Sequence, residues 1–159
     1  MSESSIEASL VEVAIQQLKR KPFVAEYNRR PVGEKQEFMM AYACYVMWLI
    51  MVGASKSQEP AKVKSIVESI HTTFRKYDWY RAGLFERIWE SIQDFLPAMR
   101  PPPNTGILIP LVHVILAANN AGCHLQQTTE PTVMFDSVMV MKELTQIAAA
   151  PRKRWQFWK

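Results

Sequence analysis

The sequence predicts an all-α protein, a single-domain bundle of about six helices around a central apolar helix at about residues 34–53. Apolar residues recur at helical spacing in most segments of the chain, and Ser, Thr and Pro stand where helices begin. No pair of short alternating segments predicts a β-hairpin. A chain of 159 residues, 48% of them hydrophobic, can bury the core that such a bundle needs.

The first predicted helix begins at a capping box and ends at a proline. Ser4 and Glu7 have the S-x-x-E spacing in which each side chain satisfies a free backbone N–H of the first turn. Pro22 should close this helix, because proline cannot continue a helical hydrogen-bond pattern. A loop is predicted at residues 28–33, and the central helix should begin directly after it.

The central helix contains the longest uncharged run of the chain. Residues 38–54 include 17 consecutive uncharged residues, which is the lower limit for a bilayer span. Against a span, Tyr42, Cys44 and Tyr45 lie in the middle of the run. A helix that is apolar on all sides is also typical of the centre of a bundle. We therefore predict a buried core helix rather than a transmembrane helix.

Four more helices are predicted after the central one. Ser57 should cap a helix that continues to the break near Asp78, and the next helix should occupy residues 84–97. The β-branched residues of the segment 107–121 could suggest a strand, but the length of the segment and the glycine that follows it favour a helix that begins near Pro110. The last helix should occupy residues 129–150.

The charge distribution divides the chain into a helical domain at residues 1–150 and a C-terminal tail at residues 151–159. The net charge is +4, and four of the 19 basic residues lie in the tail, which leaves 15 basic against 15 acidic residues in the domain. The basic and aromatic side chains of the tail are Arg152, Lys153, Arg154, Trp155, Phe157, Trp158 and Lys159. A cationic, aromatic tail on a neutral body predicts an attachment element.

The tail chemistry suits an acidic protein surface or an anionic membrane surface. It argues against nucleic acid, because the charge-balanced domain offers no additional basic patch. In the structural alternative, Trp155 and Trp158 pack onto the domain and fix the C-terminus. A second candidate binding surface is the acidic ridge formed at helical spacing by Glu86, Glu90 and Asp94. Such ridges usually face solvent, but this one could bind a basic segment such as the tail of a second copy.

The histidines suggest a pocket but no metal site. Glu68 and His71 have E-x-x-H spacing, which occurs once and lies beside the predicted apolar stripe, so a solvated surface position is expected. His113, Asn120 and His124 share one helix face and mark a possible ligand pocket. A helix separates the two imidazoles by about 16 Å, too far for one metal ion. We expect a buried His113 with a hydrogen-bond partner.

No motif of a known enzyme class is found: a Gly-rich phosphate loop, a G-x-S-x-G elbow and an H-E-x-x-H segment are all absent. Nine methionines suit an irregular core or an adaptable binding groove. Cys44 and Cys123 predict buried thiols in a reducing compartment.

The expected function is that of a non-catalytic helical adaptor or accessory protein that binds another macromolecule, in one version as a homo-oligomer. No cofactor or metal is expected. The first alternative is an enzyme or small-ligand binder with a pocket near His113, Asn120 and His124. The second is a peripheral membrane protein attached through its tail. The first residues lack the pattern of a secretory signal, so we expect a cytoplasmic location or attachment to a membrane surface.

Overall fold

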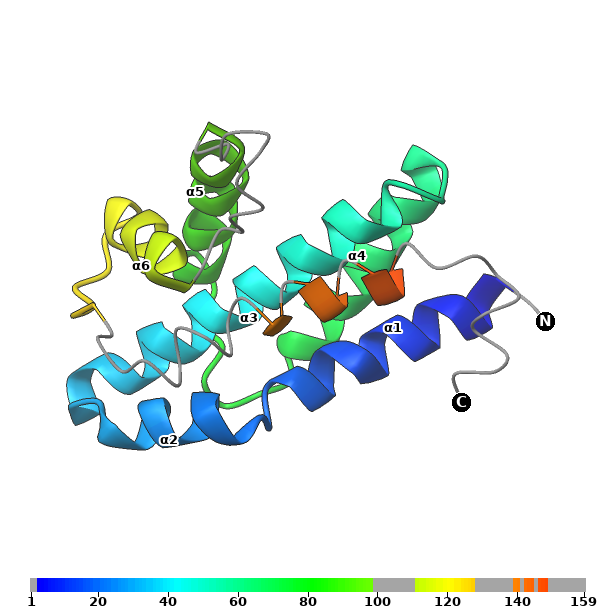
Figure 1. The fold of residues 1–159 in the computed structure, drawn as a ribbon. Helices are drawn as coiled ribbons and strands as arrows, with labels where there is room; N and C mark the ends of the chain where they lie inside the picture. Colours follow the sequence, from blue (N-terminus) through cyan, green and yellow to red (C-terminus); the bar gives the residue numbers. More distant parts are fainter. Residues whose placement is uncertain (1–2, 99–110, 128–138, 141, 145, 149–159) are drawn as a thin grey trace.

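The computed structural model describes residues 3–98, 111–127, 139–140, 142–144 and 146–148, and it has no strand within them. Residues 139–140, 142–144 and 146–148 are helical as well. The predicted all-α bundle is confirmed (Figure 1). The helices with complete bounds are α1 (Glu3–Gln17), α2 (Lys21–Arg29), α3 (Val32–Ala54), α4 (Pro60–Phe74), α5 (Leu84–Ala98) and α6 (Leu111–Asn120).

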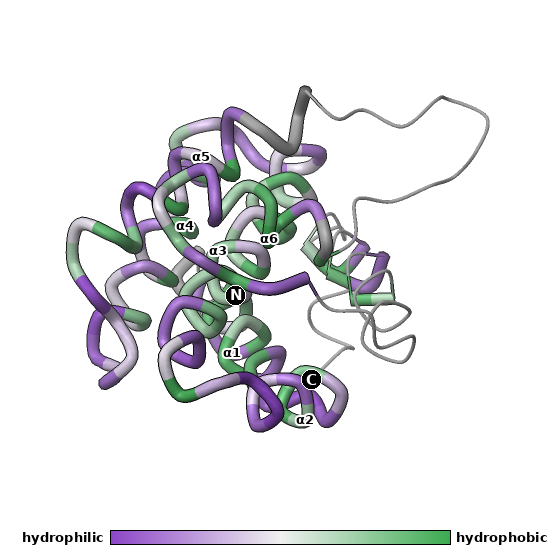
Figure 2. Tube along the Cα trace, turned by 90° about the vertical axis from the view of Figure 1, so that its left-hand side faces the viewer, coloured by the Kyte–Doolittle hydropathy of each residue, from purple (hydrophilic) through white to green (hydrophobic). Residues whose placement is uncertain are grey.

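Helix α3 is the central element, as predicted. Helices α1, α2, α4, α5 and α6 all pack against it. The views in Figures 1 and 2 place it between α4 and the helical residues 139–140, 142–144 and 146–148. Tyr42, Tyr45 and nearly every other side chain between Phe38 and Ile50 are buried. By length and composition alone α3 could cross a membrane, but its most apolar 18-residue stretch is 78% buried inside the bundle.

The chain between α1 and α3 differs from the prediction. Pro22 does not close the first helix but lies in the first turn of α2, where its missing N–H removes no helical hydrogen bond. The predicted loop at residues 28–33 is reduced to a short corner in which Pro31 is the N-cap of α3. Phe23 fixes α2 in place by stacking on Tyr42 of α3, with ring centroids 3.8 Å apart. Within the described residues, α2 is therefore a helix that the sequence did not predict.

The ends of the later helices follow their local signals except in α4, which begins after the predicted cap and ends at Phe74 rather than near Asp78. The prediction that Ser57 caps the next helix is wrong, because the N–H of Ser57 donates to the carbonyl of Ala54 in the turn that ends α3. Glu59 is the N-cap of α4 instead, and it makes no side-chain capping bond. Gly122 follows α6 with φ +111°, a conformation that favours glycine. The predicted start of the last helix, Thr129, lies outside the described residues.

A buried arginine fixes the segment after α6 to the corner between α2 and α3. The side chain of Arg30 is only 3% exposed, and its Nη1 donates to Glu34 Oε1 at 2.9 Å and to the carbonyl of Gln126 at 2.6 Å. The N–H of Gln126 donates to the same Glu34 oxygen at 3.0 Å. Glu26 lies 3.5 Å from Arg30 Nη2, and the guanidinium lies over the ring of Phe38. One end of α3 is thereby covered by a cluster of paired, oppositely charged side chains.

Candidate functional site

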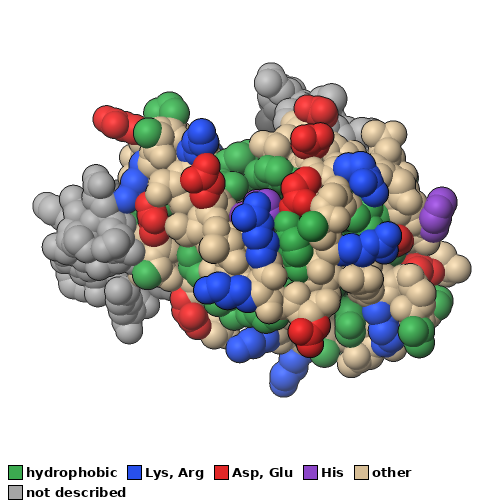
Figure 3. Space-filling model, turned by 180° about the vertical axis from the view of Figure 1, so that it is seen from behind, with side chains coloured by type: hydrophobic (Ala, Val, Ile, Leu, Met, Phe, Trp, Pro, Cys, Tyr) green, Lys and Arg blue, Asp and Glu red, His purple; other side chains and the backbone are tan. Residues whose placement is uncertain are grey.

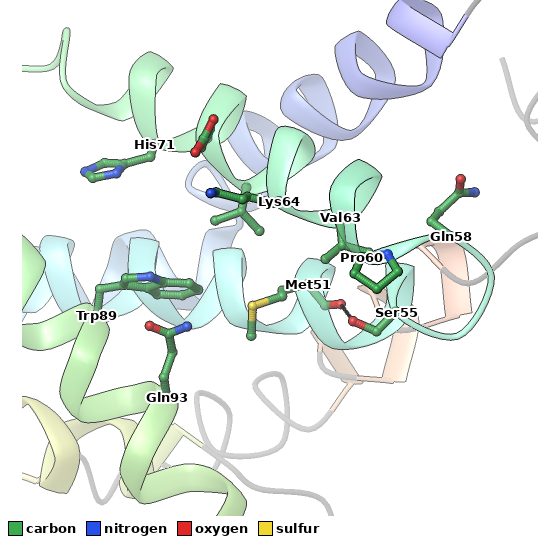
Figure 4. Close-up of a pocket in the computed structure, with 11 residues that line it drawn as sticks. Met51, Ser55, Gln58, Pro60, Val63, Lys64, His71, Trp89 and Gln93 are labelled. Atoms are coloured by element: carbon green, nitrogen blue, oxygen red, sulfur yellow. Dashed lines mark hydrogen bonds between the residues drawn. The ribbon is translucent and has the colours of Figure 1, made fainter.

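An open pocket of about 540 Å³ lies between α4 and α5, above the C-terminal end of α3 (Figure 4). Its volume falls in the range of about 300–1,000 Å³ that is typical of ligand pockets. The residues that line it are Met51, Ser55, Gln58, Pro60, Val63, Lys64, Val67, Glu68, His71, Trp89 and Gln93. We call this pocket the groove, and we count as its rim the exposed charged residues that line it or directly follow a lining residue in the chain.

The interior of the groove is apolar and comes from three helices. Trp89 of α5, Met51 of α3 and Val63 of α4 point into the same space (Figure 4). Trp89, Met51 and Val67 are only partly buried, so they present apolar surface to solvent. Tryptophan and methionine are both enriched at protein interfaces, where the thioether adapts to the shape of a partner. This part of the surface has the composition of a binding site.

The rim of the groove carries mostly negative charge. Lys64 and Glu68 line the α4 side, and both are exposed. On α5, Glu90 and Asp94 directly follow the lining residues Trp89 and Gln93, and both are also exposed. The face that carries α4, seen from behind in Figure 3, shows hydrophobic side chains between acidic and basic groups. Glu59 and Lys56, which follow the lining residues Gln58 and Ser55, are exposed as well, so the rim carries four carboxylates against two ammonium groups.

One end of the groove is closed by a hydrogen-bonded cluster around His71. The ring of His71 stacks on Phe85, with centroids 5.1 Å apart. Its Nε2 lies 3.0 Å from Glu86 Oε2 and 3.1 Å from the hydroxyl of Tyr80. The predicted solvated position is wrong for His71, whose side chain is 18% exposed. Its carboxylate partner is Glu86 and not Glu68 of the E-x-x-H segment.

The acidic ridge is divided by this cluster. Glu86 accepts hydrogen bonds from the Tyr80 hydroxyl and, at 2.7 Å, from the N–H of Gly83. Partial burial raises the pKa of Glu86, but the hydrogen bonds from Tyr80, Gly83 and His71 outweigh it and lower the pKa overall. Glu86 is thus tied to the α4–α5 connection. Glu90 and Asp94 remain exposed as predicted and can meet a basic partner.

The predicted pocket residues on α6 lie away from the groove. His113 is partly buried, burial lowers its pKa, and its buried Nδ1 has no hydrogen-bond partner among the described residues. Asn120 and His124 are exposed, and none of the three lines the groove. The neighbouring Asn119 instead bonds both backbone polar groups of Leu125, at 2.8 and 2.9 Å. A ligand at His113 stays a prediction.

Cys44 and Cys123 are buried free thiols, as predicted. Burial raises the pKa of both, that of Cys123 to about 12, so neither is a ready nucleophile at neutral pH. Within the described part of the chain, no three His, Cys, Asp or Glu side chains converge in a way that could hold a metal ion.

The tail at residues 151–159 lies outside the described residues, so its predicted role is open. Comparisons of the chain with models of protein families, with curated proteins and with solved structures give no match. The groove could not be predicted from the sequence, because the half-buried state of Trp89 depends on the neighbouring helices rather than on local spacing.

Proposed function

We propose that the protein is a non-catalytic helical adaptor or accessory protein that binds another protein through the groove. The observation that supports this is a half-buried tryptophan, Trp89, and a methionine, Met51, at the bottom of an open pocket with a charged rim. Few residues contribute most of the free energy of a typical protein interface, and tryptophan is the most characteristic of them. The proposed partner presents apolar or aromatic side chains from a helix or an extended segment.

The groove suits a macromolecular segment better than a small enclosed ligand. Its two sides belong to different helices, α4 and α5, and its mouth is open along the surface (Figures 3 and 4). A segment that lies along it could place side chains on Trp89 while its own charges meet the rim. Attachment of the protein to an anionic membrane through the tail is compatible with this proposal, because it would use residues outside the groove.

A second candidate function is small-ligand binding at His113. The specific observation in its favour is the buried Nδ1 without a hydrogen-bond partner among the described residues. A buried polar atom of this kind ordinarily finds a donor or acceptor. A polar ligand that supplies one is expected to shift the imidazole resonances of His113 in an NMR titration.

The first proposal can be tested with two matched substitutions in the full chain. Val67→Lys puts a charge on the wall of the groove, whereas Leu116→Lys makes the same kind of change at an exposed apolar position of α6. A protein captured from native lysate is purified, and its affinity is measured by calorimetry. We expect binding at least about tenfold weaker for V67K, or about 1.4 kcal/mol, and unchanged for L116K. Equal affinity for V67K and the wild type, with circular dichroism showing both folded, would refute the proposal.

A further inference from the structure

We propose that the groove binds the C-terminal tail, residues 151–159, of a second copy of this chain, so that the protein self-associates. This inference rests on the proposed function in one respect, that the groove is a docking surface. It adds the identity of an occupant. Three observations lead to it: the apolar interior of the groove, the charge of its rim, and the position of the last described helical residues.

The tail supplies aromatic side chains that match the groove interior. Trp155 and Trp158 are three residues apart and share a face if the tail is helical, whereas Trp155 and Phe157 share a face if it is extended. Either conformation presents two aromatic rings on one side. In the groove they would meet Trp89 and Met51. Aromatic pairs and sulfur–aromatic contacts both add to the effect of burying apolar area.

The tail also supplies the complementary charge. It has four basic residues and no acidic residue, and the rest of the chain is charge-balanced. On the rim, the four exposed carboxylates of Glu59, Glu68, Glu90 and Asp94 outnumber the two ammonium groups of Lys56 and Lys64. Opposite charges that remain partly solvated steer association and set its orientation, and salt weakens them. The contact should therefore depend strongly on ionic strength.

The position of the C-terminal helical residues favours a second copy over the same molecule. Figures 1 and 2 place the helical residues 139–140, 142–144 and 146–148 on one side of α3 and helix α4 on the other side. The tail follows these residues in the chain, whereas the groove lies between α4 and α5. Two molecules that exchange tails would make two identical contacts related by a twofold axis. The second contact then forms within the complex, which raises the overall affinity.

Sedimentation velocity of the full chain over a concentration series tests the proposal. The wild type should self-associate. The tail variant W155A/W158A and the groove variant E90K/D94K should each raise the dissociation constant at least tenfold. The control E12K/D78K makes the same change in net charge at exposed positions outside the groove and should behave as the wild type. Lys64→Glu should strengthen association, because it replaces a rim cation that opposes the tail with a carboxylate.

Mixing the variants identifies the source of the tail. The groove variant keeps an intact tail and the tail variant keeps an intact groove, so their mixture should form a heterodimer although neither associates alone. Self-association that persists in the tail variant would overturn the inference. So would a wild type that stays monomeric at all concentrations, with the tail docked on its own groove or free. If V67K still abolishes partner binding in that case, the proposed function stands and only the occupant is wrong.

Discussion

Replacement of Arg30 by methionine should destabilise the fold far more than the same replacement of its neighbour Arg29. Both arginines lie close to Glu26, Arg29 at 2.9 Å and Arg30 at 3.5 Å. They differ in exposure, since the side chain of Arg29 is 50% exposed and that of Arg30 is 3% exposed. Methionine retains much of the length of the arginine stem, so the comparison isolates the guanidinium group.

The expected loss of stability depends on the charges that stay buried when the Arg30 guanidinium is removed. Removing one partner of a buried ion pair costs about 3–5 kcal/mol, because the other charge stays buried without compensation. Here Glu26 keeps its contact with Arg29, so the uncompensated charge falls mainly on Glu34. We therefore expect a loss near the lower limit, about 3 kcal/mol. For Arg29→Met the loss should stay below about 1 kcal/mol, as for other exposed ion pairs.

Urea unfolding followed by far-ultraviolet circular dichroism measures both values. With a slope of about 2 kcal/mol per molar urea, R30M should lower the midpoint by about 1.5 M. The double variant R30M/E34M should recover part of this loss, because it also removes the stranded carboxylate. If R30M and R29M lose the same stability, or if R30M/E34M is less stable than R30M, the ion pairing of Arg30 does not stabilise this corner.

Two further predictions concern pH and glycine. The Ser65 hydrogen bond lowers the pKa of Glu7 below its ordinary 4.5, and the pKa of Glu86 is lowered as well. The stabilisation by the two ionised carboxylates is therefore complete above pH 4.5 and is lost as the pH falls through the lowered pKa values. In a plot of the urea midpoint against pH, E7Q and E86Q should each make the fall at acid pH less steep. A fall as steep as that of the wild type would contradict this. Gly122→Ala should destabilise the fold by about 1–2 kcal/mol, because Gly122 has a positive φ. Gly33→Ala should stabilise the fold by about 0.4–1 kcal/mol, because Gly33 is helical and has open space around it. The two variants should therefore shift the thermal unfolding temperature in opposite directions.

Most of the helical architecture could be predicted from the sequence because its signals are local. The central helix is apolar on every side, and α6 ends at a glycine that takes positive φ. Helix α2 was missed because it depends on distant partners. Its Phe23 stacks on Tyr42, and the adjacent Arg30 bonds Gln126, 96 positions away in the chain. A nine-residue segment that begins with Lys-Pro gives no local indication of either contact.

The candidate site was less predictable because it forms between elements. The acidic ridge follows from four-residue spacing, and Glu90 and Asp94 are exposed as that spacing predicts. The capture of Glu86 by His71 and Tyr80 could not be inferred in the same way, because it depends on how the α4–α5 connection folds back. The groove has the same origin, since its residues come from three helices and the turn between two of them.

The lengths of the helices explain why the groove opens where it does. Helix α3 has 23 residues and α4 and α5 have 15 each, which correspond to about 34 Å and 22 Å at 1.5 Å per residue. At the N-terminal end of α3, α2 and the segment fixed by Arg30 provide additional cover. At the other end Met51 and Val52 stay half-buried, although they belong to the long uncharged stretch of α3. An additional apolar segment at this end would extend the core without any rearrangement of the bundle, so the groove is available for binding in the folded state.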